Sequence, residues 1–424
     1  NDAPRIDYST GAKAFLLEPQ RTNYVTSSES ITPFFATDGT TLTQNYDVSP
    51  TGENNSVLLT QNTGSVNQSI YNFGLPTTNG DYSYSFFFRA GTSTNVRFYV
   101  ANAKSENFNP QTVTAGIVNG VNLNLLFEDY GNGWFRVSTT VTLSGASFNR
   151  FLIYPDRDDL GRNIEIFGAQ YEVGSYATSY IPTSGAASTR LQDIANNSGN
   201  STLINSTEGV LYAEIAALAD DLTERRLTIS DGSNSNRVAI EYTLSSNQIK
   251  GRVVSSGATS ANINFNTSSI LDFNKIAISY KQNDFNLWFN GVKVGTDTSG
   301  NAPIGLNIIS FDNGSGGNKF IGKAKALAVY KEALTDANLR SLTYPNPVAT
   351  TFDLDFDTIA EQFTFTRGSE ATFVNAQGLI ESTASNDAPR IDYSTGAKAF
   401  LLENQSTNRM PNSEDGSTWT LNNT

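Results

Sequence analysis

The chain contains a long internal repeat, and this repeat limits its architecture more than any other feature. Residues 1–23 read NDAPRIDYSTGAKAFLLEPQRTN and residues 386–408 read NDAPRIDYSTGAKAFLLENQSTN, with the first 18 positions identical at an offset of 385. Near-identity across such a distance is typical of a tandem array, in which each module contacts mainly its neighbours. We therefore expect one period of 385 residues followed by an overhang of 39.

The composition excludes several classes of function. The sequence has no cysteine and no histidine, so thiol nucleophiles, disulfides and the commonest general base and metal ligand are missing. Acidic residues outnumber basic ones by 41 to 28, and the formal charge of −13 disfavours a nucleic-acid partner. No run of about 18 apolar residues occurs, so we expect no membrane insertion.

The missing cysteines also bear on location. Their usual interpretation is a reducing compartment, but a protein with two sizeable cores needs no disulfides. A chain with one methionine and no cysteine also offers few oxidisable groups. We therefore expect an extracellular protein, at a cell surface or a virion surface.

The secondary-structure signal is almost entirely β. Residues 82–89 (YSYSFFFR), 95–100 (NVRFYV) and 134–143 (WFRVSTTVTL) are rich in β-branched and aromatic types, with Gly, Asn, Asp and Pro between such runs. A second set of strands begins after residue 207 with GVLYAEIAAL. This spacing predicts an all-β fold of two tandem β-sandwiches, joined by a β-rich repeat-junction module.

Two local signals interrupt the strand pattern. Asn283 and Asp284 lie between two apolar runs and predict a tight hairpin. The only persuasive helix covers 335–342, where Thr335 can serve as N-cap and Asp336 favours the helix start.

The repeated segment and the first sandwich resemble known families. The segment FTRGSEATFVNAQGLIESTASNDAPRIDYSTGAKAFLLE resembles one found in bacteriophage structural proteins and bacterial surface proteins. Residues 24–183 resemble a CenC-type carbohydrate-binding jelly roll, through NGWFR at 132–136 and GAQYEVGSYATSYIPT at 168–183.

The second sandwich resembles a lectin domain. Residues 207–345 are similar to laminin-G or concanavalin A-like sandwiches, through LWFNG at 287–291 and IG at 321–322 before LAVYKEALTDANLRSL. These motifs inform the fold more than the ligand, because such sandwiches host many unrelated roles. The expected organisation is the end of a preceding junction (1–23), a jelly roll (24–183), a linker (184–206), a laminin-G-like sandwich (207–345), a junction module (346–408) and the start of the next jelly roll (409–424).

Three aromatic residues are candidates for stacking on a sugar ring: Trp134, Tyr154 and Trp288. For the two tryptophans the alternative is packing within or at the edge of a sheet. We favour packing, since Trp134 starts a strand after a Gly-Asn-Gly turn and Trp288 is flanked by apolar residues.

Calcium is a candidate cofactor. It takes six to eight oxygen ligands, which carboxylate-rich loops can supply. The candidate ligands are Asp156, Asp158, Asp159, Asp231 and Asp312. The alternatives are surface pairing of the first three with Arg157 and Arg162, and ordinary turns at the other two.

No catalytic arrangement is visible, so we expect a protein without enzymatic activity. The sequence lacks a GxSxG elbow, a phosphate-binding glycine loop and a metal motif with ligand spacing. The leading hypothesis is a repeat unit of a long extracellular filament or adhesin, which extends the structure and binds surface glycans multivalently. Its partners would be a surface polysaccharide or glycan and neighbouring repeats. The alternatives are a bacteriophage tail or head fibre that binds a receptor, and carbohydrate-binding accessory modules of a secreted enzyme.

Overall fold

The fold is all-β, as the sequence predicts. The structure is a computed structural model that describes residues 4–8, 13–32, 35–62, 64, 68–75, 77–101, 104–119, 122–145, 149–345, 371–382, 390–394 and 399–400. The chain divides into two compact units, Asn1–Pro345 and Asn346–Thr424. Among the described residues, the only helix is α1 (Asp336–Thr343). No helix in these ranges is long and apolar enough to cross a membrane.

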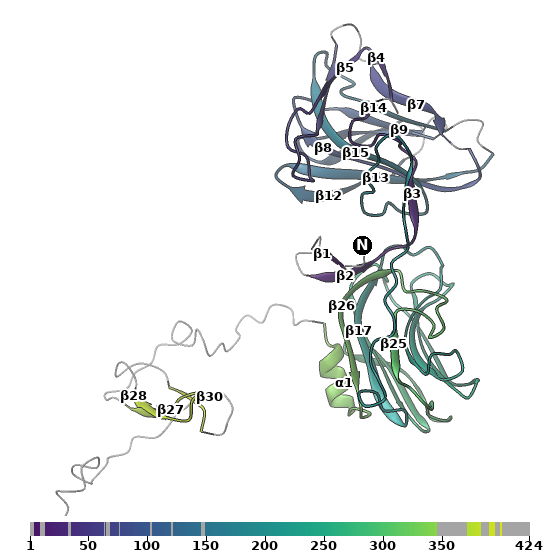
Figure 1. The fold of residues 1–424 in the computed structure, drawn as a ribbon, viewed down its shortest axis with the longest axis vertical. Helices are drawn as coiled ribbons and strands as arrows, with labels where there is room; N and C mark the ends of the chain where they lie inside the picture. Colours follow the sequence, from purple (N-terminus) through teal and green to yellow (C-terminus); the bar gives the residue numbers. More distant parts are fainter. Residues whose placement is uncertain are drawn as a thin grey trace, which may run out of the picture. The chain divides into compact units, whose positions relative to one another are not determined.

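The first unit begins with a sandwich of two six-stranded antiparallel sheets (Figure 1). One sheet has the order β11 (Thr114–Asn119), β10 (Lys104–Asn109), β9 (Val96–Val100), β14 (Asn149–Tyr154), β7 (Ser69–Leu75) and β4 (Ala36–Asp38). The other has the order β12 (Leu126–Gly131), β13 (Trp134–Leu143), β8 (Gly80–Ala90), β15 (Asn163–Val173), β6 (Val57–Gln61) and β5 (Thr40–Gln44).

Alternation along β8 builds the core of this sandwich. Tyr82, Tyr84, Phe86 and Phe88 point inward and are buried, since successive side chains of a strand face opposite sides. Phe86 packs edge to face on Phe98, with ring centroids 5.1 Å apart. Full burial of such a ring contributes about 1.5–3 kcal/mol.

A second sandwich completes the first unit. Its larger sheet has the order β1 (Arg5–Asp7), β2 (Ala14–Leu17), β26 (Gly322–Tyr330), β17 (Glu208–Ala217), β22 (Asn274–Lys281), β23 (Asp284–Phe289) and β24 (Val292–Asp297). Its smaller sheet has the order β21 (Ala258–Asn266), β20 (Gln248–Ser255), β19 (Arg237–Tyr242), β18 (Arg225–Ser230) and β25 (Ile308–Ser310).

Tight turns explain the short motifs of both sandwiches. Asn132 and Gly133 join β12 to β13 with φ of 53° and 79°, and Asn290 and Gly291 join β23 to β24 with φ of 45° and 82°. Two positive φ values are what a type I′ hairpin turn requires, and Asn-Gly adopts them at low cost. The predicted hairpin at Asn283 is also confirmed, with β22 and β23 on either side of it.

The predicted helix is confirmed as α1. The side chain of Thr335 accepts a hydrogen bond from the Asn338 amide at 3.3 Å and so caps the first turn. Leu339 is buried against Val210 of β17 and Trp288 of β23, which fixes the helix to the outer face of the larger sheet.

Two segments form strands whose partners the sequence does not predict. Residues 184–206, expected as a linker, include β16 (Ser188–Arg190), which pairs with β3 (Arg21–Asn23). The N-terminal segment, expected to complete a preceding junction, forms the β1–β2 hairpin and extends the second sandwich at β26. Strand partners distant in sequence leave no local signal, so neither pairing was predicted.

The second unit is described over two short hairpins, β27 (Thr372–Val374) with β28 (Ile380–Ser382), and β29 (Ile391–Asp392) with β30 (Ala399–Phe400). Residues 346–370, 383–389, 395–398 and 401–424 lie outside the described residues. The expected start of the next jelly roll (409–424) therefore lies wholly outside them, and so does most of the expected junction module (346–408).

Candidate functional site

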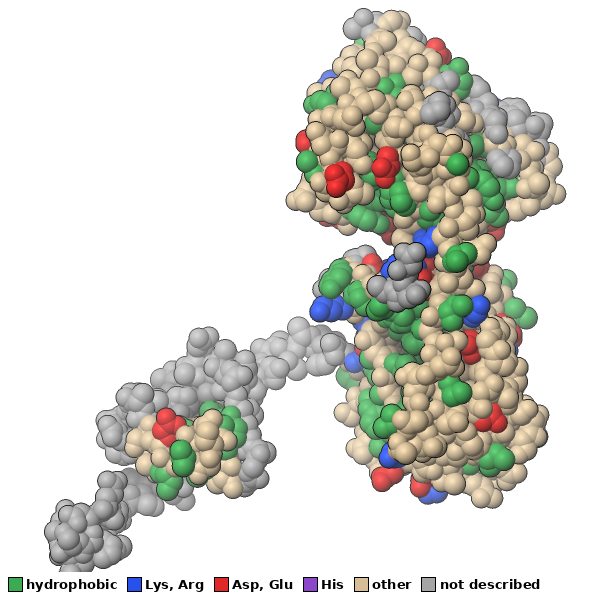
Figure 2. Space-filling model, in the orientation of Figure 1, with side chains coloured by type: hydrophobic (Ala, Val, Ile, Leu, Met, Phe, Trp, Pro, Cys, Tyr) green, Lys and Arg blue, Asp and Glu red, His purple; other side chains and the backbone are tan. Residues whose placement is uncertain are grey.

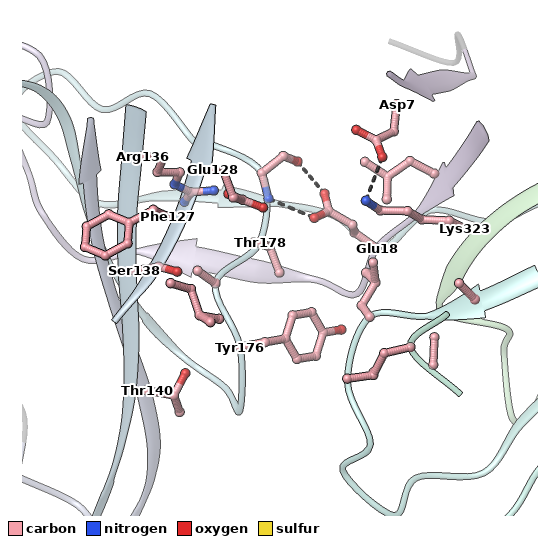
Figure 3. Close-up of a pocket in the computed structure, with 18 of the residues that line it drawn as sticks. Asp7, Glu18, Phe127, Glu128, Arg136, Ser138, Thr140, Tyr176, Thr178 and Lys323 are labelled. Atoms are coloured by element: carbon pink, nitrogen blue, oxygen red, sulfur yellow. Dashed lines mark hydrogen bonds and ion pairs between the residues drawn. The ribbon is translucent and has the colours of Figure 1, made fainter. Parts of the chain in front are cut away.

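A cleft of about 1200 Å³ in the first unit is the candidate site (Figure 3). One wall is the outer face of β12 and β13 in the first sandwich, together with residues 175–179. The other wall comes from the ends of β17 and β26, residues 271–273 and the β1–β2 hairpin. We call this cleft the groove.

Exposed apolar side chains line the groove. On β12, Leu126 is 65% exposed and Tyr130 is 47% exposed, while Phe127 between them turns toward the core. Tyr8, after β1, is 59% exposed. The Tyr130 ring is held edge to face on Phe87 at 4.8 Å, so its orientation is supported from beneath. These rings offer apolar faces of the kind that pack on a sugar.

Hydrogen-bonding groups lie beside these rings. Glu128 and Asp129 of β12 are exposed. Ser138 and Thr140 of β13 point into the groove, with Tyr176 near them (Figure 3). Carboxylates and hydroxyls at this spacing can bind a ligand rich in hydroxyl groups.

The charge of the lining is acidic. The carboxylates are Asp7, Glu18, Glu128, Asp129 and Asp272, against Arg136 and Lys323. Both cations are already engaged, since Lys323 pairs with Asp7 at 2.6 Å and Arg136 is only 2% exposed and donates to Ser85 at 2.8 Å. The groove therefore suits a neutral ligand better than an anionic one.

Glu18, which follows β2, is one of the groove-lining residues. Its side chain accepts from the Ser179 amide at 2.8 Å and from the Ser179 hydroxyl. It also pairs with Arg190 of β16 at 3.1 Å and with Arg5 of β1. Arg5 in turn pairs with Asp193. These five residues, which we call the joint, link the β1–β2 hairpin to the segments that leave the first sandwich.

The joint determines the ionisation of Glu18. Burial by itself would raise the pKa of Glu18, but the charge of Arg190 and the hydrogen bonds from Ser179 and Arg5 lower it below its ordinary value. Nearby, burial raises the pKa of Tyr176 to about 12, so this phenol keeps its proton at neutral pH.

The structure places both predicted tryptophans in packed positions. Trp134 is 2% exposed, in a cluster with Phe87, Phe167 and Tyr180, and its indole donates to the Val48 carbonyl at 3.1 Å. Trp288 is 5% exposed beneath α1. Neither ring presents an open face to a sugar, because both pack in buried clusters on the outer faces of their sheets.

The predicted Tyr154 is half-buried at the end of β14. The Arg157 guanidinium lies over its ring, 5.0 Å from the centroid. A cation stacked on this ring competes with a sugar for the same face.

The predicted carboxylates of the 154–163 loop diverge in role. Asp156 is fully buried, and its two oxygens accept from four backbone amides, of Thr94, Asn95, Asp158 and Asp159. The exposed Asp159 pairs with Arg162 at 2.8 Å, which is the surface pairing given above as the alternative. Asp158, which lies between Asp156 and Asp159 in the sequence, is exposed.

The other two predicted carboxylates lie in neighbouring loops. Asp231 accepts from Ser233 and Asn236, while Asp312 is buried and accepts from the Gly314 amide. A hydrogen bond of 2.8 Å from Asn234 to Ser315 joins the two loops. Across the described part of the chain, no group of three or more His, Cys, Asp or Glu side chains is arranged to hold a metal ion.

Sequence reasoning missed the residues of the groove. A usable signal existed in the β12 sequence LFEDYG, where alternation puts Leu126, Glu128 and Tyr130 on one face. Two apolar side chains beside an acid on the solvent face of an edge strand indicate a contact surface. The other wall comes from segments distant in sequence and left no comparable trace.

Solved structures with similar folds were found, although no protein-family model and no curated protein matches the sequence significantly. The Ruminococcus gnavus IT-sialidase CBM40, bound to alpha2,3 sialyllactose, is 14% identical over 36% of this chain and 95% of its own, with a TM-score of 0.30. Domains LG4-5 of the mouse laminin alpha1 chain are 12% identical over 70% and 92%, with a TM-score of 0.25. Sheep galectin-11 is 7% identical over 33% and 99%, with a TM-score of 0.24.

Proposed function

We propose that the chain is a non-enzymatic repeat unit of an extracellular filament or adhesin, and that it binds a neutral surface glycan in the groove. The observation that carries this proposal is the β12 face, where the supported, half-exposed ring of Tyr130 lies beside Glu128. A sugar ring packs its C–H face on the aromatic side chain and donates its hydroxyls to the carboxylate.

The acidic lining favours a neutral glycan over a sialylated or sulfated one. An anionic sugar would meet exposed carboxylates without an unengaged cation among the lining residues named above. Weak binding at one groove becomes strong attachment when many units are linked at fixed spacing. Such a unit acts at a cell surface or a virion surface, and a phage fibre would use the same groove.

The surface suits this role. On the face that Figure 2 shows, acidic and basic side chains are few, and charged residues make up only 16% of the sequence. Uncharged hydroxyl and amide groups keep an exposed unit hydrated without a strong field that would attract unrelated ions.

Replacing Tyr130 with alanine is expected to weaken glycan binding about tenfold, which equals about 1.4 kcal/mol. A glycan array identifies the ligand with the full chain, and calorimetry then compares the variants. Tyr46→Ala is the matched control, since Tyr46 is 50% exposed and lies outside the groove lining.

Glu128→Gln separates hydrogen bonding from charge, because glutamine keeps one acceptor oxygen. Glycan binding by wild type and by each variant is measured with calcium and with a chelator. A calcium requirement at the predicted aspartates would then appear as loss of binding in the chelator. The proposal fails if no neutral glycan binds, or if Tyr130→Ala and Tyr46→Ala bind equally well.

A further inference from the structure

The β1–β2 hairpin occupies an edge of the second sandwich. Phe15, Leu16 and Leu17 of β2 pair with Ala324, Lys323 and Gly322 of β26. Leu17 is 2% exposed and belongs to the core of that sandwich, and Phe15 packs edge to face on Phe311 at 5.8 Å. Backbone pairing and two apolar anchors are the means by which an added strand binds a sheet edge.

Every side chain that the hairpin contributes to these contacts lies within the first 18 residues, and all 18 recur unchanged at 386–403. The second copy therefore carries the same two anchors, at Phe400 and Leu402. These are the residue types with which the first copy contacts β26.

The second copy also forms the same hairpin in the same register. Ile6 pairs with Phe15 and Asp7 with Ala14 in the first copy; 385 residues later, Ile391 pairs with Phe400 and Asp392 with Ala399. Over the described residues, the two hairpins differ in the further pairing of the second strand. β2 lies between β1 and β26, whereas β30 belongs to a two-stranded sheet with β29.

Arg390 and Asp392 have local partners in the second copy. Arg390 donates to the Thr372 carbonyl at 3.2 Å, and Asp392 accepts from the Val374 amide at 2.8 Å. These contacts involve β29 and β27, and among the described residues β30 pairs with β29 alone.

We propose that residues 386–403 of one chain dock on the β26 edge of a second copy of this chain, in place of residues 1–18 of that copy. The first copy holds its own edge because it is tethered to it, and a tethered strand acts at high effective concentration. When the tethered strand is weakened, the identical segment of another chain replaces it, and the chains join head to tail. This exchange is a separate property from glycan binding, although it replaces Asp7, Tyr8, Leu16 and Glu18 of the groove lining with identical residues of the second chain.

The duplication supplies matched variants for the test. Leu17→Asp puts a charge into the core contact of the first copy, and Leu402→Asp makes the same change in the second. The average mass of Leu17→Asp, measured by light scattering, is expected to rise to at least twice that of the monomer as concentration increases. Wild type, Leu402→Asp and the variant with both changes are expected to stay monomeric.

Because wild type has no cysteine, an introduced cysteine pair reports the register. Leu16 pairs with Lys323, and Leu401 is the equivalent of Leu16 in the second copy. Lys323→Cys with Leu401→Cys is expected to give disulfide-linked oligomers on the Leu17→Asp background and monomers on the wild-type background.

A milder variant keeps the proposal testable if Leu17→Asp does not fold. Leu17→Ala shortens the anchor without adding charge, and it is expected to bind a labelled peptide with the sequence of residues 386–403. The same peptide with aspartate in place of its second anchor leucine is expected not to bind. The proposal is overturned if Leu17→Asp stays folded and monomeric, or if Leu17→Ala does not bind the peptide.

Discussion

Replacing Glu18 with alanine is expected to lower the free energy of unfolding of the first unit by about 3 kcal/mol, because removal of one partner from a buried ion cluster leaves opposite charges without compensation. Glu18 is 3% exposed and holds Arg5, Arg190 and Ser179 together. Urea denaturation followed by tryptophan fluorescence measures the change. Glu53→Ala is the control, since Glu53 is exposed, and it is expected to change stability by less than about 0.5 kcal/mol.

The same residue predicts a pH dependence. The pKa of Glu18 is lower in the folded chain than its ordinary value of 4.5, so folding favours the carboxylate. Its contribution to stability is fully present above pH 4.5 and is lost as the pH falls through the lower folded pKa. The stability difference between wild type and Glu18→Gln should therefore be constant near neutral pH and shrink in acid. A difference that widens in acid would show that another interaction dominates.

The sequence predicted most of the strands because their signals are local. Tyr82, Tyr84, Phe86 and Phe88 alternate with residues of the opposite face, and β8 alternates in the structure as expected. Asn-Gly pairs predict type I′ turns because their backbone preferences permit positive φ, and Asn132 and Asn290 adopt it. Thr335 predicted the start of α1 for an equally local reason.

The pairing of strands that are distant in the sequence could not be predicted from the sequence. Leu17 and Gly322 are adjacent in the sheet but 305 positions apart, and any exposed edge with a suitable face would satisfy the pattern of β2. The repeat identified residues 1–18 as a recurring segment, but it did not identify the strand with which this segment pairs.

Binding residues were predicted less well than strands. Trp134 was a candidate because tryptophan is the best stacking residue, yet its burial depends on the neighbouring segments that cover the outer face of β13. Tyr130 packs on Phe87 of the same outer face, yet it is 47% exposed. Which face of a strand remains open is set by the rest of the chain, so composition and periodicity do not decide it.

Replacing Asp156 with alanine is expected to destabilise the first sandwich by about 3 kcal/mol, because buried amides that lose a charged acceptor stay unsatisfied or must recruit water. Asp156 is 0% exposed and joins the 93–95 turn to its own loop through the Thr94 and Asn95 amides, at 2.8 and 3.2 Å. Asp158→Ala is the matched control, since Asp158 is exposed in the same loop, and it is expected to change stability by less than about 0.5 kcal/mol.

Calcium decides between the two roles proposed for this loop. If Asp156 serves only as an acceptor for backbone amides, wild type unfolds at the same temperature with calcium and with chelator, and Asp156→Ala loses the same stability in both. If Asp156 and Asp158 hold calcium, saturating calcium raises the stability of wild type by RT ln(1 + [Ca²⁺]/Kd), and either alanine variant abolishes that gain. The contacts favour the first result, because both oxygens of Asp156 already accept two amides each. A calcium-dependent gain that Asp158→Ala removes would instead establish a metal site and reverse the assignment of Asp156.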